Sequence, residues 1–159
     1  MQILEIFQYL LDLAGKEAYS DIHINTSCFP MIRDHAGNIV EIKEIPLWEE
    51  KVEIQTLSID EVQSITQYIL GPENFRVYEE TYEMDSSYKH KDICRYRVNC
   101  YKDANGSSIA LRTIPQEVPT LESLGLWEQI RVMCQRSKWL VLMTGPTGSW
   151  KSTNLAAMI

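Results

Sequence analysis

The strongest constraint on the fold is a glycine-rich segment that directly follows the apolar run 139–143. It consists of Gly145, Pro146, Thr147, Gly148, Ser149, Trp150, Lys151, Ser152 and Thr153. The segment fits the phosphate-binding pattern G-x-x-x-x-G-K-[S/T] at every fixed position except the second glycine, where Trp150 stands. A buried parallel strand that enters such a loop, followed by a helix opening at Ser152, predicts an α/β nucleotide-binding fold.

The chemistry of this loop is mainly that of the backbone. Successive N–H groups and the N-terminus of the following helix bind phosphate oxygens, while Lys151 bridges the terminal phosphates of ATP and Ser152 ligates Mg²⁺. Glycine before the lysine lets the backbone approach the phosphates, and the indole of Trp150 adds bulk there. The segment is either a nucleotide site or a loop that no longer binds, and we favour the second interpretation for this chain.

Charge and composition exclude several classes of function. The 159 residues carry a net charge of −7, and the first 119 hold 20 acidic against 11 basic residues, so nucleic acid is not an expected partner. No run reaches the roughly 18 apolar residues of a membrane span. The N-terminus has no signal-peptide pattern. The four cysteines form no C-x-x-C pair, and reduced thiols in a cytoplasmic protein fit them best. The cysteines and histidines show no metal-ligand spacing, so metal binding by side chains alone is not expected.

The first 90 residues read as a mixture of helices and short strands. Helical spacing predicts an opening helix over 3–14, and alternation predicts a strand over 20–25 followed by a hairpin over 31–42. A capping box at Ser58 to Glu61 begins a helix that Gly71-Pro72 ends, and a second helix is expected over 73–80. Residues 46–56 fit a loop or a weak strand.

Residues 93–101 give the clearest strand, with Arg95, Arg97 and Asn99 on its polar face. A turn at Asn105-Gly106 returns the chain as a partner strand over 107–113, which brings Arg112 near. From the residues alone, these arginines read as a solvated face that pairs with local acids such as Asp85 or Asp103. A second interpretation follows from the family resemblance described below.

Asp21 and His23 share the polar side of the strand over 20–25. This pair suggests acid–base chemistry, but the sequence offers no third partner. A solvent-facing strand edge is the favoured interpretation.

Helices are also expected near 120–124 and over 127–136. Pro115 and Pro119 bracket a stiff extended segment, the best linker candidate in the chain.

Six segments together resemble the type IV pilus retraction, or twitching-motility, ATPases within the type II/type IV secretion ATPase family. They are residues 20–24, 30–33, 95–99, 111–115, 124–126 and 140–159. The resemblance implies an α/β (α+β) fold: a PAS-like N-terminal domain with an antiparallel sheet over 1–113, a linker over 114–119, and the incomplete start of a RecA-like nucleotide-binding domain over 120–159.

The same resemblance implies a hexameric motor that uses ATP and Mg²⁺ for pilus retraction and docks on an inner-membrane platform protein from the cytoplasm. It also implies that Arg95, Arg97 and Arg112 contact a nucleotide phosphate across a domain or subunit boundary. The sequence departs from the family at Trp150 and stops before the acidic Walker B strand. We therefore expect no ATP turnover from these 159 residues alone. The alternative is a non-enzymatic PAS-like adaptor that assembles with a complete motor.

Overall fold

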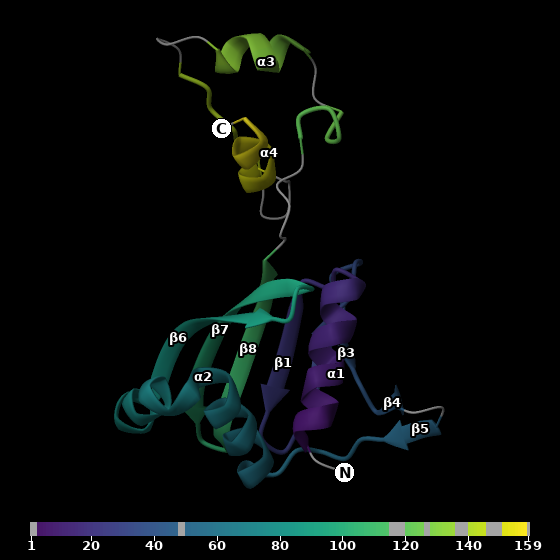
Figure 1. Ribbon diagram of the computed structural model, residues 1–159, viewed down its shortest axis with the longest axis vertical. Helices are drawn as coiled ribbons and strands as arrows, with labels where there is room; N and C mark the ends of the chain where they lie inside the picture. The colour runs from purple at the N-terminus through teal and green to yellow at the C-terminus, as the bar shows by residue number, and fades with distance from the viewer. Residues whose placement is uncertain are drawn as a thin grey trace. The chain divides into compact units, whose positions relative to one another are not determined.

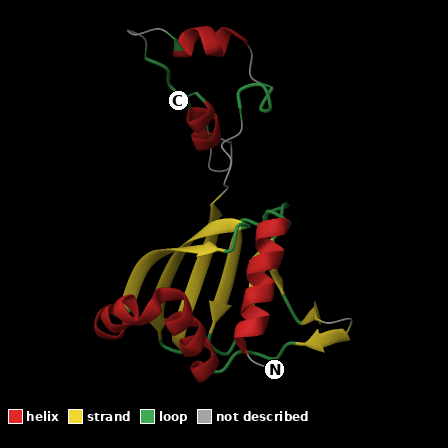
Figure 2. Ribbon diagram, viewed as in Figure 1, coloured by secondary structure: helices red, strands yellow, loops and turns green. Residues whose placement is uncertain are grey.

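The computed structural model describes six stretches of the chain, which form two compact units (Figure 2). The described residues are 3–47, 50–114, 120–125, 128–135, 140–145 and 151–158. The first unit spans Met1–Pro115 and the second Gln116–Ile159.

The first unit is built on a six-stranded antiparallel sheet in the order β3-β2-β1-β8-β7-β6 (Figure 1). Its strands are β1 (Asp21–Asn25), β2 (Met31–Arg33), β3 (Ile39–Glu41), β6 (Glu83–His90), β7 (Cys94–Asp103) and β8 (Gly106–Ile114). A separate two-stranded hairpin pairs β4 (Glu44–Leu47) with β5 (Glu50–Glu53). The predicted mixed α/β class with an antiparallel sheet around 93–101 and 107–113 is confirmed.

Two helices, α1 (Ile3–Lys16) and α2 (Ile59–Thr81), lie over one face of this sheet (Figure 1). Strand alternation turns one set of apolar side chains toward them, including Ile22, Val98 and Leu111, each at most 1% exposed. The helices close a single hydrophobic core, and the opposite face of the sheet carries the polar side chains.

Helix α1 is held tightly against β7. Its buried residues recur at helical spacing, as the sequence predicts. The Tyr96 hydroxyl, fully buried, donates a hydrogen bond of 2.5 Å to the carbonyl of Leu11. Gly15 lies so close to the sheet that a Cβ there would stand 2.6 Å from Cγ2 of Ile93. The absence of a side chain at Gly15 therefore sets how closely this helix approaches the strand.

Helix α2 begins with the predicted capping box. The Ser58 N–H donates to Oε2 of Glu61 at 2.8 Å, and the Glu61 N–H donates to Oγ of Ser58 at 3.3 Å. At Gly71 the backbone leaves the helical region, with φ of 70° and ψ of 169°. The two helices expected over 59–70 and 73–80 are thus joined through a kink, because glycine adopts positive φ and Pro72 can start a new helical turn.

Residues 46–56, expected as a loop or weak strand, contain β5 and the end of β4, which agrees with the weak-strand alternative. Other local expectations are wrong. Asp21 and His23 do not lie at a strand edge, since β1 pairs with β2 on one side and with β8 on the other. Strand β8 also continues to Ile114, one residue into the segment expected as a linker.

The second unit contains α3 (Glu128–Cys134) and α4 (Lys151–Ala157), close to the helices predicted there. Residues 121–125 form turns rather than the predicted helix, and the described residues 140–145 are not in a strand, contrary to expectation. Within the part of the chain that the structure describes, no helix has the length and apolar character needed to cross a membrane.

Candidate anion-binding face

The polar face of the sheet, opposite the helices, gathers charged side chains from strands that are distant in the sequence. Register places Arg97 of β7 opposite Arg112 of β8, Arg112 opposite Asp21 of β1, and Asp21 opposite Arg33 of β2. We call these four residues the arginine–aspartate row. Directly opposed side chains on one face of an antiparallel sheet have Cβ atoms about 5 Å apart, so neighbours in the row are in direct electrostatic contact.

Two members of the row carry the same charge side by side. Arg97 and Arg112 face one another across β7 and β8, and their side chains are 68% and 73% exposed. Like charges directly opposite in a sheet are destabilising. Arg97 has one acidic neighbour, Asp85, with 3.5 Å between Nη2 and Oδ2. The two exposed guanidinium groups therefore lie side by side, and each has a carboxylate partner, Asp85 for Arg97 and Asp21 for Arg112.

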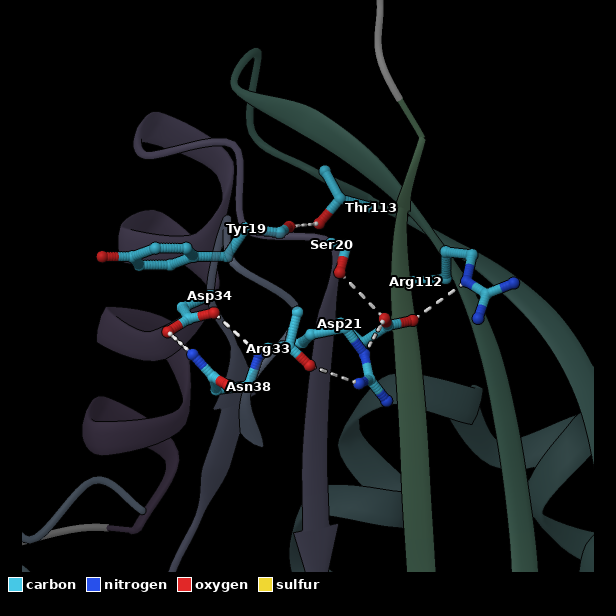
Figure 3. Close-up of polar contacts among 9 residues, drawn as sticks. Tyr19, Ser20, Asp21, Arg33, Asp34, Asn38, Arg112 and Thr113 are labelled. Atoms are coloured by element: carbon cyan, nitrogen blue, oxygen red, sulfur yellow. Dashed lines mark hydrogen bonds and ion pairs between the residues drawn. The ribbon is translucent and has the colours of Figure 1, made fainter. Parts of the chain in front are cut away.

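Asp21 is the buried centre of the row (Figure 3). Its Oδ1 accepts a hydrogen bond of 2.9 Å from Nε of Arg112. Its Oδ2 accepts from Nε of Arg33 at 3.0 Å and from the Ser20 hydroxyl at 2.9 Å. Burial acts to raise the pKa of this carboxyl, but the hydrogen bonds from Arg112 and Ser20, with the charge of Arg112, outweigh it and hold the pKa below its usual value. Asp21 is therefore a carboxylate at neutral pH.

An open hollow of about 270 Å³ lies beside the two exposed arginines. Its polar lining comprises Arg97 and Arg112, the carboxylates Asp21 and Asp85, and the neutral side chains Asn99 and His23. Burial lowers the pKa of His23; Asp21 opposes this effect, whereas Arg33 and Arg112 add to it, so the imidazole is neutral at pH 7. Among the described residues, Nε2 of His23 is buried without a hydrogen-bond partner. The hollow thus combines two arginines and two carboxylates with a neutral histidine whose Nε2 is buried.

The structure brings two of the three predicted arginines to this hollow. Arg95 lies on the same face, one register step away, opposite Ile114. The alternative pairing with Asp85 is present for Arg97. Asp103 instead accepts hydrogen bonds from the backbone N–H groups of Asn105 and Gly106.

Sequence reasoning missed the contacts of Asp21 with Arg33 and Arg112. The one available signal was the alternation over 20–25, which put Asp21 on the polar side.

The phosphate-loop segment belongs to the second unit. Lys151 is the first residue of α4, as expected for a lysine at the start of the helix that follows such a loop. Pro146, Thr147, Gly148, Ser149 and Trp150, and the side chain of Ser152, lie outside the described residues. The predicted binding of ATP and of Mg²⁺ through Ser152 therefore stays a prediction.

Comparison with known proteins gives a consistent result. No family model matches the chain. The type IV pilus retraction ATPase PilT of Pseudomonas aeruginosa is 36% identical over 150 residues, which are 94% of this chain and 40% of that protein. A twitching motility protein of Neisseria gonorrhoeae is 33% identical over 132 residues, covering 83% of this chain and 32% of that protein. The chain thus spans less than half the length of these curated relatives.

Two solved structures share the fold. The crystal structure of the pilus retraction motor PilT with bound ADP has a TM-score of 0.74 at 28% identity, covering 95% of this chain and 41% of that one. The ATPase DotB of Legionella pneumophila has a TM-score of 0.72 at 24% identity, covering 99% of this chain and 42% of that one. In both fold and sequence the chain is similar to part of the secretion ATPases. Within that class it is PilT-like.

Proposed function

We propose that this chain supplies the N-terminal unit and phosphate-loop segment of a pilus retraction motor that binds ATP with Mg²⁺. The proposal is supported by the relatives named for pilus retraction and twitching motility and by the structural neighbour with bound ADP. The proposed division is a PAS-like domain over 1–113, a linker over 114–119 and the start of a RecA-like domain over 120–159. The motor is a hexamer on the cytoplasmic side of the inner membrane, docked on a platform protein.

One observation carries the functional role of the N-terminal unit: Arg97 and Arg112 stand opposite each other on the polar face, beside an open hollow. Arginine binds phosphate through its planar fork of N–H donors, and two forks side by side match a polyphosphate chain. We assign this face to the phosphates of a nucleotide that is bound across a domain or subunit boundary of the motor. Arg95, one register step away, lies where it extends the same positive field.

Inorganic pyrophosphate tests this assignment, because it presents the phosphates without the base or sugar. Isothermal titration of the full chain should show binding that Arg97→Ala and Arg112→Ala each weaken by about fivefold, the factor that corresponds to about 1 kcal/mol for an exposed ion pair. The matched control is Arg76→Ala, which removes the same charge from an exposed position on α2. Equal affinity in all four proteins would refute the role of this face.

A second candidate function follows from Trp150 in the phosphate loop. A tryptophan where the backbone must approach phosphate favours an adaptor that assembles with a complete motor and does not hydrolyse ATP itself. Turnover of Mg·ATP by the purified chain, at a rate that Lys151→Ala abolishes, would exclude the adaptor. Absence of turnover, together with co-elution of the chain and a complete PilT-like motor in size exclusion, would support it.

A further inference from the structure

We propose that Asp21 is a positioning residue that orients Arg112 for phosphate binding. This inference rests on the proposed function of the polar face and names a residue that acts on the ligand only through Arg112. Asp21 is 7% exposed, so the anion would contact the arginine and not the carboxylate.

The Asp21 carboxylate is fixed from three directions (Figure 3). Arg33 and Ser20 donate to Oδ2, and Arg112 donates to Oδ1. A carboxylate that is bonded through both oxygens cannot rotate about χ2 without breaking at least one charge-assisted hydrogen bond. The oxygen that faces Arg112 therefore has a defined place relative to the sheet.

Arg112 uses only one of its donor groups in this contact. Its Nε–H donates to Asp21, and its two Nη groups have no hydrogen bond to any residue that the structure describes. In Figure 3 the end of the guanidinium group points away from Asp21. The contact thus holds the base of the guanidinium group and leaves its outer fork directed at solvent, the arrangement that a phosphate oxygen pair requires.

The other two arginines of the row show that this geometry is particular to Arg112. The guanidinium group of Arg33 makes two hydrogen bonds: its Nε donates to Asp21, and its Nη1 donates to the Gly37 carbonyl at 3.0 Å. Among the described residues, Arg97 has only the long contact with Asp85, and both of these side chains are more than half exposed. Arg33 is therefore an anchor for Asp21, and Arg97 is a charged group without a fixed orientation.

Electrostatics and positioning predict opposite changes in anion affinity when the charge of Asp21 is removed. Removing a negative charge beside an anion site should tighten anion binding by electrostatics alone. Removing a group that orients the binding fork should weaken it, because the freed side chain must be immobilised on binding. Asp85 is the matched control, because it is an acid on the same face beside the other arginine. Unlike that of Asp21, its carboxylate is exposed and does not fix the orientation of its neighbour.

The experiment measures pyrophosphate affinity of the full chain by isothermal titration at one salt concentration. We expect Asp85→Asn to tighten binding and Asp21→Asn to weaken it about threefold, the loss expected when one long side chain is no longer held in place. In the Arg112→Ala background, Asp21→Asn should no longer weaken binding. A merely structural role for Asp21 would weaken binding in both backgrounds.

A second variant keeps the test decisive if Asp21→Asn does not fold. Asp21→Glu retains the charge beside both arginines but moves the carboxylate by one methylene, so positioning predicts weaker binding and electrostatics predicts no change. Tighter binding by Asp21→Asn, or unchanged binding by Asp21→Glu, overturns the inference. If Arg112→Ala itself leaves the pyrophosphate affinity unchanged, the result refutes the proposed function of the polar face and not the positioning role of Asp21.

Discussion

Gly15→Ala tests helix propensity against packing, because the two effects change the free energy of unfolding in opposite directions. In an isolated helix this change stabilises by up to about 1 kcal/mol. In this fold the new Cβ would stand 2.6 Å from Cγ2 of Ile93 and 2.8 Å from Sγ of Cys94. Neither atom is the far end of a long flexible chain, and Cys94 is buried in the core. Helix α1 or the start of β7 must therefore shift.

The magnitude follows from these two opposing effects. Inserting a methyl group into a packed core costs about 1–3 kcal/mol, and helix propensity returns less than 1 kcal/mol so close to the end of the helix. We expect a net loss of about 1–2 kcal/mol in the free energy of unfolding. For a unit of this size that corresponds to a fall in Tm of about 4–12 °C.

Urea unfolding followed by circular dichroism measures the loss directly. Ile93→Ala removes the nearest contacting atom, so the double variant should be more stable than the sum of the two single changes predicts. A Gly15→Ala protein as stable as the parent, or strictly additive behaviour with Ile93→Ala, would show that α1 does not approach the sheet as closely as described.

Three further predictions concern other parts of the chain. Trp150→Gly should increase ADP affinity in isothermal titration, since it removes the Cβ and indole from the phosphate loop; equal affinity would show that tryptophan is accommodated. The pKa of His23 is lowered from 6.5 in the folded state, so the unfolded state takes up the proton first as pH falls. The free energy of unfolding should therefore fall between pH 7.5 and 5.5 by more than in His23→Gln, and an equal fall in both proteins contradicts this. Ser58→Ala should cost about 1 kcal/mol in urea unfolding through loss of the helix cap, and no change would mean that Glu61 or water replaces it.

Local patterns were sufficient to predict much of the first unit. The alternation over 93–101 and the capping box at Ser58 each depend on neighbouring residues, and both appear in the structure. The predicted hairpin turn is also present, but it lies at Ala104-Asn105, one residue earlier than expected, because Gly106 already pairs with Asp103. The sequence could not decide between a loop and a weak strand over 46–56, because β4 and β5 are only four residues each and form a separate hairpin. Such short strands give too few alternations to be recognised.

The candidate site was harder to predict, because its geometry depends on contacts between distant segments. Asp21 and Arg112 are 91 positions apart, and only the β1–β8 register places them opposite each other. Sequence alone therefore indicated Arg97 and Arg112 but not the carboxylate that binds one of them. A polar residue on a predicted strand carries no information about which strand will pair with it.

The position of β1 in the sheet has a consequence for the order of folding during synthesis. β1 is made early, yet one of its two neighbours, β8, ends at Ile114. The hairpin formed by β1 and β2 can pair as soon as it is synthesised, whereas β1 and β8 must wait for about 90 further residues, a long loop to close. A nascent chain arrested before Gly106 should thus leave Ile22 and Ile24 accessible to protease, and one extended beyond Ile114 should bury them.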